Sequence, residues 1–360
     1  MLALRQTLLL SVRLRLQMSA LEPPAKRPRS EAAGAAAAVA LGDPRVLVTL
    51  NVNGLKSRLL VKEKDETDAS ARSRADAHAA ALIADLCKDK PDVIFLTEVH
   101  LKGHPQDQGR VEPVVASPAA QRKMTERGVA ALQRLQAAPE LAGFKMLMSL
   151  HAKERGLSGC IALLRPGLEP QSVSYNLEGA PGHHPEGRVI LLEFATMRLL
   201  LTYSPNNGVK DESRSRRLLW DTQSHALLCA AHAKPIIWGG DLNIAPTEED
   251  WNVVMNGVPG TTPDERRRFA VMLSAGKLRD AWRSLHPGVR GGWTWRGDSY
   301  KGSGLMRLDH WIVSETLWSR VRSCEATEPS TATRGPRNEP ASYYCGSDHW
   351  PLTLTLSEAA

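Results

Sequence analysis

The sequence predicts a layered α/β sandwich with mixed β-sheets, and three observations support this fold class. Short apolar runs rich in β-branched residues, which are typical of buried strands, recur between residues 46 and 356. Segments with the apolar spacing of a helix separate some of these runs. Other runs follow one another directly, and this mixture favours mixed sheets over a purely parallel barrel.

The expected elements follow in order along the chain. Strands are expected at residues 46–50, 92–97, 159–164, 188–194, 198–203, 235–238, 293–296, 308–313 and 350–356. Helices are expected at 75–86 and 214–232, and a third begins where Thr262 provides an N-cap and Pro263 the first helical position. Residues 102–122, rich in Pro, Gly and Gln, are expected to form a long surface loop.

Positive charge is concentrated at the N-terminus. Residues 1–30 hold six basic side chains and one acidic one, whereas the rest of the chain has 40 basic and 38 acidic residues. We therefore expect a disordered tail over residues 1–43, Ala-rich near its end, and a single catalytic domain over residues 44–358. Any nucleic-acid contact of the domain must then use a local patch.

The tail carries two candidate targeting signals. Residues 1–21 contain arginines and leucines but no acid, as in a mitochondrial transit peptide, although an untargeted tail has the same composition. Residues 26–29, Lys-Arg-Pro-Arg, resemble a nuclear-import signal. Met18 lies between the two, so initiation at Met1 or Met18 would direct the protein to the mitochondrion, the nucleus or both.

Other compartment signals are missing from the sequence. The five cysteines lie far apart, which excludes both a disulfide framework and a zinc motif. No apolar run reaches the roughly 18 residues of a membrane span. We expect a monomer that does not bind membranes.

Polar residues stand at one end of six of the expected strands. The clearest case is Pro235-Ile236-Ile237-Trp238-Gly239-Gly240-Asp241-Leu242-Asn243, where a buried strand leads into two glycines and then a carboxylate and an amide. The other five ends are Asn51-Val52-Asn53-Gly54, Thr97-Glu98, Tyr203-Ser204-Pro205-Asn206, Arg307-Leu308-Asp309-His310 and Ser347-Asp348-His349. Each alone is also typical of an ordinary turn. Because loops at strand ends converge on one cleft in layered α/β proteins, we expect the six to meet.

The residue types indicate metal-dependent phosphoester chemistry. Oxygen ligands without a cluster of Cys or His favour Mg²⁺, or Mn²⁺, over zinc, and Glu98 is the leading ligand candidate. Amides and the Tyr203 hydroxyl can donate to phosphoryl oxygens. A His held by a carboxylate stays in one tautomer and cationic, which makes Asp309 and His349 a candidate pair.

These segments together resemble the endonuclease/exonuclease/phosphatase superfamily. The resemblance rests on Leu50-Asn51-Val52-Asn53-Gly54-Leu55, Leu96-Thr97-Glu98, Glu186-Gly187-Arg188, Tyr203-Ser204-Pro205-Asn206, Gly240-Asp241-Leu242-Asn243, Arg307-Leu308-Asp309 and Ser347-Asp348-His349. The stretch Thr261 to Arg266 makes the chain most similar to the exonuclease III-like, class II apurinic/apyrimidinic (AP) endonucleases. The resemblance covers residues 45–356 and implies a four-layer sandwich, two packed mixed sheets flanked by helices.

The resemblance also implies roles for particular residues. Its metal site would draw on Glu98, Asn51 and Asp348, with Asp241 and Asn243 close by, for one or two ions. Its catalytic residues would be Asp241, Asn243, His349, Asp309 and Tyr203, and whether Asp241 or His349 is the base stays open. Its substrate contacts would be Asn53 and Asn206, together with an apolar pocket for a base-less sugar formed by Trp295, Met306 and Leu308.

The implied activity is Mg²⁺-dependent cleavage of double-stranded DNA 5′ to abasic sites, with 3′–5′ exonuclease or 3′-phosphodiesterase activity on blocked 3′ ends. Asn53 in place of Asp, Thr97 in place of Gln and Met306 in place of Trp depart from the pattern of some members. Two alternatives remain: another nuclease of the fold, retrotransposon-type or RNA-directed, and a catalytically idle DNA-binding module.

Overall fold

The structure, a computed structural model, describes residues 42–102, 124–151, 158–177, 184–230, 232–297, 304–329 and 344–358. Nearly all of the expected tail (1–43) and of the expected loop (102–122) therefore lies outside the described residues. In the part of the chain that the structure describes, no helix is both long and apolar enough to cross a membrane.

The first of two six-stranded sheets is built from both ends of the domain. Its strand order is β13-β14-β1-β2-β4-β3. The bounds are β1 (Val46–Asn51), β2 (Val93–Thr97), β3 (Lys145–Ser149), β4 (Cys160–Leu164), β13 (Val321–Ala326) and β14 (Leu352–Leu356). Only β1 and β2 pair in parallel, and the other neighbours are antiparallel.

The second sheet has the order β5-β6-β7-β8-β12-β9. Its strands are β5 (Ser172–Ser174), β6 (Val189–Glu193), β7 (Arg198–Tyr203), β8 (Ile236–Asp241), β9 (Leu278–Asp280) and β12 (Asp309–Ser314). Again a single parallel pair, β7 with β8, lies among antiparallel neighbours. A separate hairpin joins β10 (Trp295–Gly297) to β11 (Gly304–Met306).

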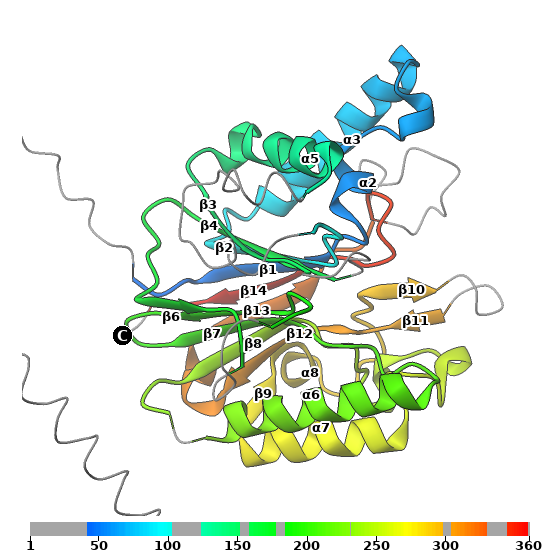
Figure 1. The fold of residues 1–360 in the computed structure, drawn as a ribbon. Coiled ribbons are helices and arrows are strands. Elements are labelled where there is room, and N and C mark those ends of the chain that lie inside the picture. Colours follow the sequence, from blue (N-terminus) through cyan, green and yellow to red (C-terminus); the bar gives the residue numbers. More distant parts are fainter. Residues whose placement is uncertain are drawn as a thin grey trace, which may run out of the picture. The chain divides into compact units, whose positions relative to one another are not determined.

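Helices cover the outer face of each sheet, which gives four layers (Figure 1). The helices α2 (Leu55–Leu59), α3 (Ala69–Cys87) and α5 (Glu126–Gln136) pack on the first sheet, and α6 (Asp211–Cys229) and α7 (Pro263–Ala275) on the second. Residues from both sheets, among them Phe95, Leu201 and Trp311, form the core between them, which the short α8 (Ala281–Leu285) also joins. The predicted four-layer sandwich is therefore confirmed.

The expected elements are all present, with shifted ends. The third helix begins at Pro263, and Thr262 caps it by accepting a hydrogen bond from the Glu265 amide. The helix expected at 75–86 extends over residues 69–87. The elements we did not expect are α2, α5, α8, β3, β5, β9, β11 and β13. Most are short or carry polar residues, which weakens their periodicity.

The two glycines before Asp241 are required by packing. A Cβ on Gly239 would lie 2.1 Å from the Trp311 ring. Gly240 has a φ of +123°, and a Cβ there would lie 2.1 Å from the Thr202 carbonyl oxygen. Glycine alone lets β8 pass this closely between its neighbours and turn at its end.

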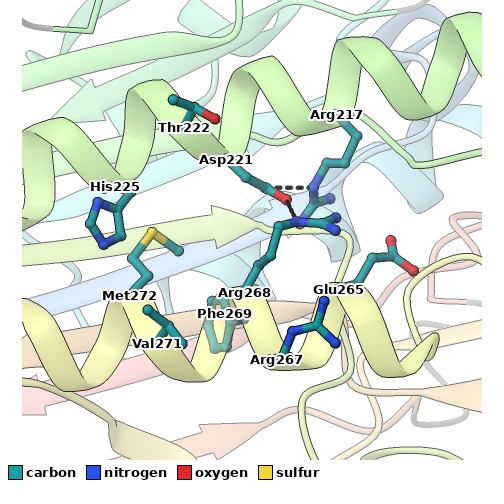
Figure 2. A pocket seen from close by; sticks show the side chains of 10 residues that line it. All are labelled: Arg217, Asp221, Thr222, His225, Glu265, Arg267, Arg268, Phe269, Val271 and Met272. Carbon is teal, nitrogen blue, oxygen red and sulfur yellow. Dashed lines mark hydrogen bonds and ion pairs between the residues drawn. The ribbon is translucent and has the colours of Figure 1, made fainter.

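Helices α6 and α7 lie side by side on the second sheet, with a groove of about 270 Å³ between them (Figure 2). Arg217 of α6 lies at the inner end of a chain of ion pairs in this groove. Its Nε donates to Asp221 at 2.8 Å, and Asp221 also accepts from Arg268 of α7 at 3.0 Å. The pairs join the two helices.

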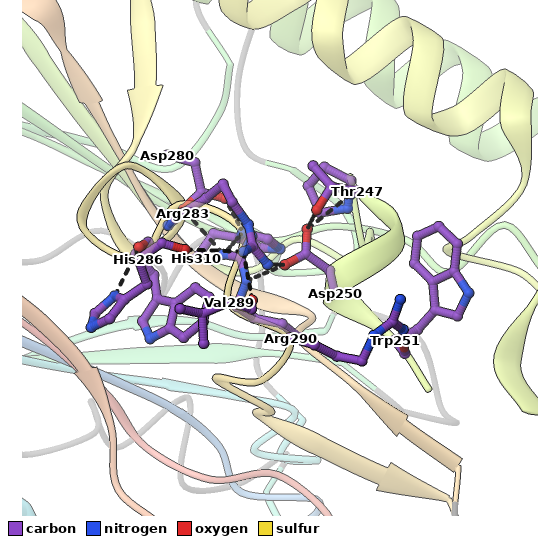
Figure 3. Close-up of polar contacts among 12 residues, drawn as sticks. Thr247, Asp250, Trp251, Asp280, Arg283, His286, Val289, Arg290 and His310 are labelled. Atoms are coloured by element: carbon purple, nitrogen blue, oxygen red, sulfur yellow. Dashed lines mark hydrogen bonds and ion pairs between the residues drawn. The ribbon is translucent and has the colours of Figure 1, made fainter. Parts of the chain in front are cut away.

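A second buried ionic network holds the start of β12 (Figure 3). Arg307 is fully buried and donates to Asp250 at 2.9 Å and to Asp280 at 2.7 and 3.1 Å. Arg283 donates to Asp250 as well. Because the pairs share well-aligned hydrogen bonds, the buried charges are compensated. The network fixes the loop that leads into Asp309.

Candidate active site

Three site residues lie in one row across neighbouring strands of the second sheet. The parallel pairing of β7 and β8 places Tyr203 opposite Asp241. The antiparallel pairing of β8 and β12 places Asp309 opposite Asp241 on the other side. The sheet therefore fixes these three side chains relative to one another through its backbone hydrogen bonds.

The first sheet contributes Asn51 and Glu98. The Asn51 side-chain nitrogen donates to Glu98 and to Asp241, both at 2.9 Å, and so connects the two sheets. The Tyr203 hydroxyl also donates to Glu98, at 2.5 Å. The Asn51 side-chain oxygen accepts from the backbone of Asn53 at 3.0 Å, so its nitrogen, not its oxygen, faces the carboxylates.

Glu98 is held as a carboxylate. Burial alone would raise its pKa, but hydrogen bonds from His100, Tyr203 and Asn51 outweigh that effect and lower the pKa to about 2. The His100 Nε2 atom lies 3.2 Å from the other Glu98 oxygen. Glu98 has a φ of +49°, a conformation that non-glycine residues adopt at a cost and that recurs at functional sites.

Asp241 uses its two oxygens differently. One accepts from the backbone nitrogen of Asn243 at 2.9 Å and closes the turn after β8. The other faces Asn51 and lies 3.9 Å from His349 Nε2. Burial raises the pKa of Asp241 to about 7, although the His349 charge opposes the shift.

Asp309 and His349 form a buried pair. His349 Nδ1 lies 2.7 Å from an Asp309 oxygen, and the Asp309 backbone nitrogen donates to Thr294. Burial would lower the pKa of His349, but the carboxylates of Asp309 and Asp241 outweigh it and raise the pKa to about 10. The imidazole is therefore cationic at neutral pH, with Nε2 directed towards Asp241.

The two asparagines lie side by side. The Asn206 side-chain nitrogen donates to the Asn243 side-chain oxygen at 3.0 Å. The Asn243 side-chain nitrogen donates to the Ser204 carbonyl at 2.9 Å. Both residues line the same cavity as Asp241, so each can present polar atoms to a phosphate group there.

The hairpin β10–β11 brings an apolar wall to this cavity. Trp295 Nε1 donates to Asp348 at 3.0 Å, and Asn53 donates to the other Asp348 oxygen at 2.9 Å. Met306 and Leu308 belong to a small hydrophobic cluster, against which Trp295 packs. One wall of the cavity is therefore apolar and the other carries charge.

The cavity of about 210 Å³ unites most of the residues singled out in the sequence. Its lining comprises Glu98, Tyr203, Asn206, Asp241, Asn243, Met255, Val258, Pro259, Trp295, Met306, Leu308, Asp348 and His349. Asn51, Asn53 and Asp309 are not lining residues, but each is hydrogen-bonded to one. Met255, Val258 and Pro259 were not predicted from the sequence, because they come from a loop whose path depends on tertiary packing.

The donor set fits a hard divalent cation near Glu98 better than between Asp309 and His349. Asp241, Asp309 and His349 offer ligand atoms within 4.8 Å of one another. However, the 2.7 Å contact of His349 with Asp309 is a hydrogen bond that leaves no room for an ion between them. Glu98 and Asp348 line the cavity with carboxylate oxygens, the ligand type that Mg²⁺ or Mn²⁺ prefers.

Sequence comparison places this chain in a known family. Residues 48–349 match the model of the endonuclease/exonuclease/phosphatase family. A DNA-(apurinic or apyrimidinic site) endonuclease of Arabidopsis thaliana is 34% identical over 74% of this chain and 77% of its own length. The DNA repair nuclease APEX1 of Danio rerio is 32% identical over 57% of this chain and 62% of its own length.

Solved structures agree on the fold. The AP endonuclease LMAP from Leishmania major superposes with a TM-score of 0.61 at 22% identity, covering 88% of both chains. An AP endonuclease from Archaeoglobus fulgidus gives a TM-score of 0.56 at 23% identity, covering 87% of this chain and 100% of its own. The chain belongs to the endonuclease/exonuclease/phosphatase family of metal-dependent phosphodiesterases.

Proposed function

We propose that this protein is a DNA repair AP endonuclease that hydrolyses the phosphodiester 5′ to an abasic site and trims blocked 3′ ends as a second activity. The observation that carries the proposal is the cavity with one charged and one apolar wall. The charged wall suits a phosphodiester, and the apolar wall suits a sugar that lacks its base. The relatives named AP endonucleases support the same function.

The metal is assigned to the Glu98 end of the cavity. Glu98 and Asp348 would hold Mg²⁺, or Mn²⁺, with Asn51, Asp241 and Asn243 close by. When bound, the ion would neutralise charge on the phosphoryl oxygens and polarise the scissile bond. Asn51 keeps Glu98 and Asp241 at a fixed separation through its shared donor.

Asp241 is assigned to the attacking water. Asp241 lines the cavity, its Oδ2 accepts from Asn51 and lies 3.9 Å from His349 Nε2, and its raised pKa suits a proton acceptor near neutral pH. Asn243, fixed to the Asp241 turn, would hold the water or a phosphoryl oxygen. A cationic His349 cannot accept the proton, so we assign Asp241 as the base.

His349 and Tyr203 are assigned to the phosphate. The His349 cation, kept in place by Asp309, would stabilise the negative charge that develops on the phosphoryl group. The Tyr203 hydroxyl keeps its proton, because burial and the Glu98 charge raise its pKa well above 10. Its one proton, which the hydroxyl donates to Glu98 here, would turn to a phosphoryl oxygen when DNA is bound, and the Asn206 amide would donate beside it.

The apolar wall is assigned to lesion recognition. Trp295, Met306 and Leu308 would contact the extruded sugar, and a base attached to it would have to enter the same 210 Å³. Selectivity then comes from the limited space and from the low cost of extruding a nucleotide that pairs with nothing. Asn53 is placed beside Asp348, where it can contact the DNA backbone.

A nicking assay tests the function. Purified protein is incubated with duplexes that contain a tetrahydrofuran abasic analogue or no lesion, with Mg²⁺ or EDTA. We expect a Mg²⁺-dependent nick 5′ to the analogue only. Equal cleavage of both duplexes would favour a nuclease of other specificity. Binding without any cleavage would favour an idle DNA-binding module.

Localisation and assembly are proposed from the sequence. Fusions of a fluorescent protein to chains that start at Met1 and at Met18 would test delivery to mitochondrion and nucleus. Identical distribution of the two would exclude targeting by alternative initiation. Light scattering would test the expected monomer.

A further inference from the structure

Arg217 connects the outer helix layer to the catalytic loops. It is a buried arginine, 4% exposed, in the second turn of α6, where an arginine would ordinarily face solvent. One terminal nitrogen donates to the Pro205 carbonyl at 2.9 Å and to the Asn243 carbonyl at 3.2 Å. A single guanidinium thus joins the loop after β7 to the loop after β8.

The two carbonyls belong to the segments that present Asn206 and Asn243. Pro205 directly precedes Asn206, and the Asn206 side chain donates to that of Asn243. Asn243 has a φ of +49°, which a backbone holds only when its surroundings fix it. The Arg217 contact to the Asn243 carbonyl provides such a constraint.

A neighbouring residue of α6 supports the same loop. Trp220 Nε1 donates to the Ser204 hydroxyl at 3.0 Å, and the Ser204 carbonyl accepts from the Asn243 side chain at 2.9 Å. One turn of α6 therefore contacts both Ser204 and Pro205, directly before Asn206. Because Trp220 is packed in the apolar cluster under α6, the helix is a rigid base for these contacts.

Arg217 is in turn oriented from the outside. Asp221 accepts a hydrogen bond from Arg217 Nε and a second one from Arg268 of α7 (Figure 2). The guanidinium is therefore held in the orientation that faces the loops. Arg217 and Asp221 both line the groove between the two helices. The Arg217 side chain therefore borders the groove as well as the loops after β7 and β8.

We infer that Arg217 is a positioning residue for Asn206 and Asn243, and that Asp221 sets its orientation. This inference rests on the proposed phosphodiesterase function of the site. A misplacement of about 1 Å in a group that orients reactants can lower a rate by roughly 10²-fold. Arg217→Ala should therefore lower the single-turnover nicking rate by about 10²-fold, with a smaller effect on the DNA concentration for half saturation.

Chemical rescue gives the sharpest test. Removal of the side chain in Arg217→Ala leaves a space that opens on the groove, so added guanidinium should restore part of the lost rate. Sodium chloride of equal concentration corrects for the general effect of salt on DNA binding. The matched control is Arg267→Ala, which removes a 70% exposed arginine from the same groove, whose partner among the described residues is Asp264. It should keep the wild-type rate and gain nothing from guanidinium.

Amide hydrogen exchange supplies a readout independent of activity. The backbone amides of residues 203–208 and 241–245 should exchange faster in Arg217→Ala than in the wild type. In Arg267→Ala their exchange rates should be unchanged. If Arg217→Ala does not fold, two milder variants replace it. Arg217→Lys retains a hydrogen-bond donor but lacks the several nitrogens of a guanidinium, and Asp221→Asn removes the charge that orients Arg217. Both should show the same effects more weakly. The inference would be overturned if these variants kept the wild-type nicking rate and the wild-type exchange rates. It would also be overturned if their nicking rate fell only in proportion to the fall in Tm and guanidinium restored none of it. Absence of nicking by the wild type would instead remove the proposed function, and the exchange data would then decide the role of Arg217.

Discussion

His349 Nδ1 lies 2.7 Å from the Oδ2 atom of Asp309, and both side chains are buried. The contact holds the imidazole in one orientation, with Nε2 directed at Asp241 3.9 Å away. It also keeps a positive charge inside the protein, because the Asp309 carboxylate compensates for the cost of burial. The charge of His349 therefore depends on Asp309.

Replacement of Asp309 should change the pH profile as well as the rate. In Asp309→Asn, the carboxylate that opposes burial most strongly is lost, so the pKa of His349 falls from about 10 towards its ordinary range. The cation is then lost as pH rises through neutrality, whereas in the wild type it persists until about pH 10. We expect single-turnover nicking to fall by roughly 10²- to 10³-fold at pH 8 and to recover partly at pH 6.

The control is Asp76→Asn, a change at a carboxylate that is 63% exposed and pairs with Arg134. It should leave both the rate and the pH profile unchanged. If the nicking rate of Asp309→Asn were lower than that of the wild type by the same factor at every pH from 6 to 9, Asp309 would have no role in keeping His349 charged.

Glu98→Gln should raise the concentration of Mg²⁺ that the enzyme needs. The Glu98 pKa of about 2 means that its charge is available at every working pH, and the amide removes it without changing shape. We expect the half-saturating Mg²⁺ concentration to rise at least about 10-fold, as for other losses at metal sites. Nicking rates at a series of Mg²⁺ concentrations, together with calorimetric titration of Mg²⁺, measure this.

Glu193→Gln is the matched control, since Glu193 lies at the far end of β6 and pairs with Lys234. It should bind Mg²⁺ like the wild type. An unchanged Mg²⁺ requirement in Glu98→Gln would exclude Glu98 as a ligand and point to Asp348 alone.

Strand ends were the part of the site that the sequence could predict. Tyr203, Asp241 and Asp309 each end or begin an apolar run, and strand register then places them in one row. Local pattern is sufficient there because neighbouring strands must align their ends around one cleft.

Arg217 and Arg307 could not be predicted in the same way. Arginine in a helix or loop is ordinarily a solvated residue, and only tertiary contacts bury these two. The loop that carries Met255 and Val258 likewise has no periodic pattern, so its place in the apolar wall depends on packing against β11 and Leu308. The fold class was predictable from periodicity, whereas contacts between distant loops were not.

The apolar wall should control recognition of the abasic site. Met306→Ala removes side-chain atoms from the cavity, and the lost contacts should weaken binding of the tetrahydrofuran duplex by about 10-fold or more. The larger cavity should also admit undamaged nucleotides more readily, so the preference for the lesion should fall. The ratio of kcat/KM for the two duplexes measures this preference.

Met272→Ala is the matched control, because Met272 is equally buried but packs between α7 and the second sheet. Both variants should lose stability by about 2–5 kcal/mol, the usual cost of such a truncation. Only Met306→Ala should change lesion preference. An equal change in both would mean that loss of stability, not the wall, causes the effect.

Breaking the buried network around Arg307 should destabilise the fold in a pH-dependent way. Asp280→Asn leaves a buried guanidinium with one carboxylate fewer, and we expect the free energy of unfolding at pH 7 to fall by about 3–5 kcal/mol. Burial would raise the pKa of Asp280, but Arg307 and His310 outweigh it and hold the pKa below its ordinary value of 3.8. The stabilisation is therefore present above pH 3.8 and lost as the pH falls through the lower pKa of the folded protein.

Urea unfolding of wild type and Asp280→Asn between pH 3 and 8 tests both statements. The difference in unfolding free energy should be constant from pH 8 to about pH 5 and shrink towards pH 3. Asp211→Asn, at a side chain that is 98% exposed, should change stability by less than about 0.5 kcal/mol throughout. A difference below about 1 kcal/mol at neutral pH, or one that grows in acid, would show that the Arg307 network does not hold the loop before Asp309 as its geometry indicates.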